Sequence, residues 1–144
     1  MTEPAPDTPT PRQHQIVLWV LWFAFLNGIV MFRIFLAKPL PPGAAPQPDA
    51  FPWAISLLPV LLSVAVRWAL LPRAQFVQQG LVYMVLGLAF AEASSFLGIF
   101  LTPSHLDLIC GASFLGAFQF APLWARRFFP AEDAAPAPPL VPRR

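Results

Sequence analysis

Four apolar runs, each about 20 residues long, constrain this chain more than any other feature. They cover residues 16–36, 52–71, 77–101 and 106–124. An α-helix rises about 1.5 Å per residue, so each run can cross the roughly 30 Å hydrocarbon core of a bilayer. Of the 144 residues 57% are hydrophobic and 11% are charged, which exceeds what a soluble domain of this size can bury. The sequence therefore predicts an all-α integral membrane protein, a four-helix transmembrane bundle.

The segments outside the runs indicate the domain organisation. Most of the 19 prolines fall there. Residues 1–15 have too little apolar surface to offset the entropy of ordering, so we expect a disordered N-terminal tail. Residues 16–125 form a single transmembrane domain, and residues 126–144 form a basic juxtamembrane segment and a disordered C-terminal tail. Ser104 and Asp107 resemble a capping box that begins the fourth helix, which makes the third and fourth spans a tight hairpin.

The distribution of arginine and lysine predicts the orientation in the membrane. Four spans place both termini and the turn at residues 72–74 on one side. That side holds most of the basic residues, and the other side holds Lys38 with Arg33 near it. Because basic loops stay in the cytoplasm, both termini should be cytoplasmic, in an inner or plasma membrane. The basic residues on the proposed cytoplasmic side are Arg12, Arg73, Arg126, Arg127, Arg143 and Arg144.

Glu92 is the one acid deep within the third run. An ionisable group at that depth should face protein or water, and it is a candidate functional group by default. We identify Glu92 as a candidate proton- or ion-binding carboxyl, helped by Ser95 and by Asn27 of the first run. Arg33 is a possible charge partner, but we favour the alternative that its long side chain extends to the interface. The alternative is that Glu92 is a hydrogen-bonded packing residue or a contact to another subunit.

Small residues recur at helical spacing near Glu92. Gly87, Ala91 and Gly98 lie on the third run, and Ala112 and Gly116 lie on the fourth, four residues apart. Small residues at such spacing let two transmembrane helices approach closely. We therefore expect the third and fourth helices to pack along these residues, with Glu92 beside the contact.

The tripeptide Ala91-Glu92-Ala93, with Gly98 beyond it, resembles the ion-carrying helix of the rotary ATPase proteolipid subunits. In that family a carboxylate among small residues binds a proton or sodium. The resemblance covers about ten residues, and it implies that role for Glu92 alone. In the family a glycine-rich helix precedes the acidic one, whereas here the small-residue helix follows it.

The sequence lacks the residues that several classes of function require. The single cysteine, Cys110, lies in an apolar run, so a Cys-x-x-Cys metal or redox site is excluded. We find no nucleophile with its base, no phosphate-binding glycine loop and no basic stripe for nucleic acid, and we expect no enzyme, cofactor or metal. Two hypotheses remain. The first is a non-enzymatic membrane protein that is an accessory subunit or associates with itself, and the second is a small proton- or cation-coupled carrier or channel that uses Glu92.

Overall fold

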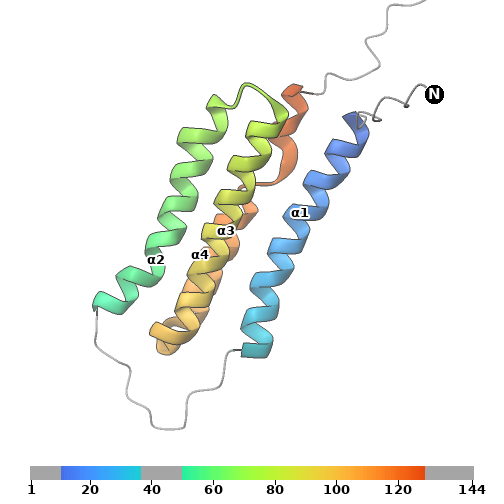
Figure 1. Ribbon diagram of the computed structural model, residues 1–144. Helices are drawn as coiled ribbons and strands as arrows, with labels where there is room; N and C mark the ends of the chain where they lie inside the picture. The colour runs from blue at the N-terminus through green and yellow to red at the C-terminus, as the bar shows by residue number, and fades with distance from the viewer. Residues whose placement is uncertain (1–10, 37–49, 129–144) are drawn as a thin grey trace, which may run out of the picture.

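The computed structural model describes residues 11–36 and 50–128, and in it the four apolar runs form four antiparallel helical spans (Figure 1). Each span is long and apolar enough to cross a membrane, which confirms the predicted all-α four-helix bundle. The first span is α1 (Pro11–Met31), continued by the π-helical turn η1 (Phe32–Leu36), and the second is α2 (Ala50–Ala65), continued by η2 (Val66–Leu70) and η3 (Leu71–Arg73). The third span is α3 (Val77–Leu101). The fourth consists of η4 (Pro103–His105), α4 (Leu106–Phe118) and the 3₁₀ helix η5 (Pro122–Phe128).

α3 is the central helix of the bundle. It packs against α2, α4 and α1, whereas α1 contacts mainly α3 and α4. Figure 1 shows α2, α3 and α4 close together and α1 to one side of them. It also shows the start of α1 and the helix η5 at the same end of the bundle. The fold is therefore a three-helix unit, α2–α3–α4, with α1 laid against its α3 and α4 side.

The first span begins earlier than the sequence predicts. α1 starts at Pro11 rather than at Ile16, so residues 11–15 of the expected disordered tail are helical. A proline loses no hydrogen bond in the first turn of a helix, and its fixed φ suits that position. The rest of the two predicted tails, residues 1–10 and 129–144, lies outside the described residues, as does most of the connector at residues 37–49.

The fourth helix ends earlier than the sequence predicts. α4 stops at Phe118 instead of continuing to Trp124, and the chain turns before it enters η5. Pro122 explains the break, because a proline ring clashes with the carbonyl four residues before it, which here belongs to Phe118. The freed end of α4 receives a donor from η2, since Arg67 Nε lies 2.8 Å from the carbonyl oxygen of Gln119.

The predicted capping box at the start of α4 does not form. Ser104 Oγ lies 3.0 Å from Nδ1 of His105, and Asp107 forms an ion pair with Arg33. α4 has no side-chain cap, and η4 leads into it instead. The tight connection between α3 and α4 is present all the same, because Thr102 and the three residues of η4 are enough to join them.

Two kinds of interior lie on the two sides of α3. Toward α1 and the end of α4, large apolar side chains such as Leu18, Ile29, Leu88 and Phe120 are buried together. Between α2, α3 and α4 small and hydroxylated residues are buried beside the larger Ile109 of α4. The buried hydroxyl residues of the described chain are Ser56, Ser63, Ser94, Ser95, Thr102 and Ser113.

Pro59 lies inside α2 and cannot donate to the carbonyl of Ile55. In transmembrane helices, neighbouring side chains re-satisfy carbonyls freed in this way. The Ser94 hydroxyl of α3 donates to the carbonyl of Ser56, three residues before Pro59. This hydrogen bond ties α3 to α2 beside the proline.

Candidate functional site

Glu92 lies near the middle of α3 and points toward α1. Its carboxyl group occupies the space beside Gly28, where a Cβ atom at position 28 would overlap Oε1 of Glu92. The residue is partly buried, so α1 covers one side of the carboxyl and leaves another side open. Gly28 is therefore what allows the acid to fit between α1 and α3. The sequence prediction missed Gly28, although it directly follows Asn27 in the same span.

Arg33, the possible charge partner of Glu92, pairs with Asp107 instead. Its Nη2 and Nε atoms each lie 2.7 Å from Oδ1 of Asp107, at the start of α4. Both side chains are exposed, Asp107 at 83% and Arg33 at 46%. Near the end of the bundle both ions keep contact with solvent, whereas a pair with Glu92 would require desolvation of both ions at mid-span. The arginine therefore links η1 to α4.

Asn27 and Ser95 do not form a cluster with Glu92. Asn27 is exposed, and its Nδ2 atom lies 2.8 Å from the carbonyl oxygen of Phe23 in its own helix. Ser95 is fully buried and lies next to Cys110 of α4. Within residues 11–36 and 50–128, Glu92 makes no hydrogen bond or ion pair with either of them or with any other residue. The candidate site therefore contains one carboxyl group, not a polar constellation.

The α3–α4 contact contains the small residues that the sequence singles out. Ala91 lies against Gly116, with the Ala91 Cβ atom 3.5 Å from where a Cβ would stand on Gly116. The glycines of α3, in contrast, pack against larger side chains of the segment that follows it. Gly87 lies under the ring of Phe120, and Gly98 lies under Ile109, with Cγ2 2.9 Å from an added Cβ.

Glycine here makes room for large side chains more often than it brings two backbones together. Ala112, also predicted to pack, is partly buried. Gly111 has nothing within 4 Å of an added Cβ, so it faces open space beside this contact.

Two arginines hold backbone groups at the end of the bundle where α1 begins. Arg67 donates to Gln119, and its guanidinium carbon lies 5.4 Å from the centre of the Trp68 ring. Arg127 of η5 reaches the turn between α2 and α3. Its nitrogens lie 2.8 Å from the carbonyl oxygen of Leu71 and 3.3 Å from those of Pro72 and Ala74. Arg67 links η2 to the broken end of α4, and Arg127 links η5 to the turn after η2, which the sequence did not predict.

No protein-family model, curated protein or solved structure matches this chain. In the described part of the chain, His, Cys, Asp and Glu do not form a group of three that could hold a metal ion.

Proposed function

We propose that this chain is a non-enzymatic, multi-pass membrane protein that acts by assembling with other transmembrane helices. The partner is either a further copy of the chain or a larger complex in which the chain is an accessory subunit. One observation carries the proposal. Two polar side chains near the middle of their spans are not enclosed by the bundle: Asn27 is exposed on α1, and Glu92 is only partly covered where it lies between α1 and α3.

Polar groups inside a bilayer are costly when they face lipid. Membrane proteins therefore turn such groups toward the bundle interior, toward a water-filled cavity or toward another helix. Asn27 uses one amide hydrogen on Phe23 and stays exposed, and Glu92 has a partner on neither α1 nor α4 among the described residues. A neighbouring transmembrane helix can hydrogen-bond with both groups. Within the described residues the single bundle leaves the Glu92 carboxyl and the rest of the Asn27 amide without partners, and assembly supplies them.

Energy transfer between two fluorescently labelled copies of the full chain in lipid vesicles tests self-association. Glu92→Leu and Asn27→Leu should each weaken association by about fivefold, the effect of losing one interhelical hydrogen bond of about 1 kcal/mol. Leu61→Ala on the exposed face of α2 is the control, because it changes an apolar residue 63% exposed and should have no effect.

Affinity purification from the native membrane separates the two kinds of partner. Stoichiometric recovery of another membrane protein, lost in Glu92→Leu, supports an accessory subunit. The proposal would be overturned if energy transfer were no greater than random encounters in the vesicle produce and if purification recovered the chain alone.

A second candidate function is proton or cation transfer through Glu92. It is favoured by the open side of the carboxyl group and by the absence of a competing cation on it within the described residues. Glu92→Gln keeps the size and hydrogen-bonding capacity of the side chain, so it should preserve insertion. If vesicles containing the chain take up protons or cations, Glu92→Gln should abolish that flux. Equal flux through both proteins would exclude Glu92 as the carrier.

We further propose an inner or plasma membrane location with both termini in the cytoplasm. The basic residues of the described chain support this orientation, because Arg12, Arg73, Arg126 and Arg127 lie at the end where α1 begins and η5 lies. A fluorescent protein that matures only in the cytoplasm should be bright when fused after Arg144. A dark fusion in intact cells would indicate the opposite orientation, with both termini outside the cytoplasm.

A further inference from the structure

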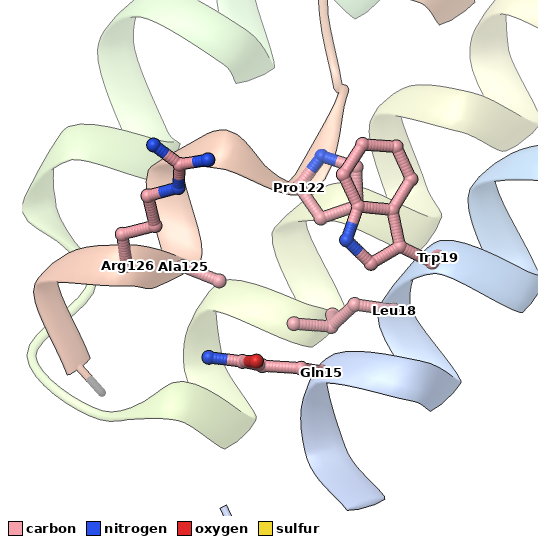
Figure 2. A pocket seen from close by; sticks show the side chains of 6 residues that line it. All are labelled: Gln15, Leu18, Trp19, Pro122, Ala125 and Arg126. Atoms are coloured by element: carbon pink, nitrogen blue, oxygen red, sulfur yellow. The ribbon is translucent and has the colours of Figure 1, made fainter. Parts of the chain in front are cut away.

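The break in α4 creates a small cavity between η5 and the first turns of α1. The cavity has a volume of about 150 Å³ and is lined by Gln15, Leu18 and Trp19 of α1 and by Pro122, Ala125 and Arg126 of η5. Figure 2 shows the side chains from both segments around this cavity, with the guanidinium of Arg126 extending away from Gln15 and Leu18. A straight α4 would not turn η5 away at this level, so the cavity is a consequence of Pro122.

The polar side chains around this cavity all carry N–H donors, and they have no hydrogen-bond partner among the residues that the structure describes. They are the amide of Gln15, the indole N–H of Trp19 and the guanidinium of Arg126. Across the ranges 11–36 and 50–128, none of the three makes a hydrogen bond or ion pair. Arg127, the next residue, differs, because it donates to the carbonyls of Leu71, Pro72 and Ala74. Arg126 is thus a cation left available beside a cavity that also offers two neutral donors.

The surrounding charge is positive. Of the residues that the structure describes, Glu92 and Asp107 are the acids, and they lie at mid-span and at the start of α4. The end of the bundle with the cavity therefore carries arginines and no described acid. The described arginines at this end are Arg12, Arg67, Arg73, Arg126 and Arg127.

We propose that this cavity binds the phosphate of an anionic phospholipid. Phosphate oxygens accept hydrogen bonds from guanidinium, amide and indole N–H groups, and guanidinium matches their geometry especially well. The cavity lies at the end of the four spans, which is the level of lipid headgroups when the bundle spans a membrane. Basic pockets between transmembrane helices on the cytoplasmic side are typical headgroup sites. The inference does not depend on assembly through Glu92 and Asn27, which lie near mid-span.

Native mass spectrometry of the full chain in detergent tests the proposal. The protein is titrated with phosphatidylglycerol, with phosphatidylcholine of the same acyl chains as the zwitterionic comparison and inorganic phosphate as the soluble one. We expect phosphatidylglycerol to bind in preference to phosphatidylcholine, and inorganic phosphate not to displace it. Arg126→Gln should weaken phosphatidylglycerol binding by about fivefold, as expected for one arginine near an anionic headgroup.

Two further variants separate this cavity from general charge attraction. Gln15→Leu removes a donor without changing the net charge, and it should weaken binding by about twofold, a fraction of a neutral hydrogen bond. Arg73→Gln removes one charge from the same end of the bundle but does not line the cavity, and it should have less effect than Arg126→Gln. Equal loss in Arg73→Gln and Arg126→Gln, equal binding of the two lipids, or displacement by inorganic phosphate would each overturn the proposal.

Discussion

Different side chains hold the α2–α3–α4 unit together and attach α1 to it. Within the unit, small residues and serine bring elements close together, as where Ala91 lies against Gly116 and Ser94 donates to Ser56. α1 instead packs through larger side chains, including Leu18 and Ile29. Its hydrogen bond to the unit, from Trp22 Nε1 to the carbonyl of Ala117 at 3.1 Å, lies beside this apolar contact.

This difference indicates where the molecule has room to change. The ring of Phe120 fills the space over Gly87, so the surroundings of this glycine cannot adjust without loss of contacts. The α1 contact leaves Glu92 partly exposed beside Gly28 and leaves a small cavity farther along the helix. We therefore expect the three-helix unit to dominate stability, and the margins of α1 to be where the protein binds other molecules.

Gly87→Ala tests the tight contact and should have the largest effect. The added methyl would overlap the ring of Phe120, which is fully buried and held by its neighbours. Overpacking of this kind destabilises by about 2 kcal/mol. The measurement is the free energy of unfolding in mixed dodecyl sulfate micelles. Gly111→Ala is the matched control, since its methyl meets open space and the change should leave stability equal or slightly higher. Equal stability of the two variants would contradict the comparison.

Asp107→Asn tests the ionic link between α1 and α4 and should have a smaller effect. Because both partners are exposed, removing the ion pair should lower the free energy of unfolding by about 0.5 kcal/mol. A double-mutant cycle with Arg33→Gln measures the coupling directly, and added salt should reduce it. A coupling above about 2 kcal/mol would mean that α1 is held more firmly than exposed pairs allow.

Gly28→Ala tests the loose contact of α1 and should barely change stability. The overlapping group is the end of the flexible Glu92 side chain, which can rotate away, and alanine favours the helix slightly over glycine. The expected change is instead in the carboxyl group, which should turn outward. The rate of labelling of Glu92 by an apolar carbodiimide, followed by mass spectrometry, should rise relative to the natural chain. Glu92→Gln supplies the unlabelled control, and an unchanged rate would show that Gly28 does not hold the carboxyl.

The sequence was most informative where a single physical requirement acted along one helix. The third span runs from Val77 to Leu101 as predicted, because it is continuously apolar and Pro103 follows it directly. The fourth helix was predicted too long, although Pro122 was visible in the sequence. Its apolar neighbours suggested a continuing span, and the clash of its ring with the Phe118 carbonyl ended the helix.

The candidate site could be predicted only in part. Glu92 stands out in the sequence because one acid among apolar residues is rare. Its neighbours depend on how α1 is rotated and shifted against α3, and hydropathy along one chain does not specify that register. The pairing of Arg33 with Asp107 follows from the same register, since it brings the end of α1 to the start of α4.

The sequence by itself determined that this chain forms four apolar helices long enough to span a membrane, because length and hydrophobicity are properties of each segment alone. Only the tertiary structure decided which polar groups are satisfied. Ser94 found a carbonyl in α2 and Arg67 found the broken end of α4, whereas Glu92 and Asn27 remained at the periphery. Hydrogen bonds between helices require a specific distance and direction, and these are set by packing among all four helices and not by any one of them.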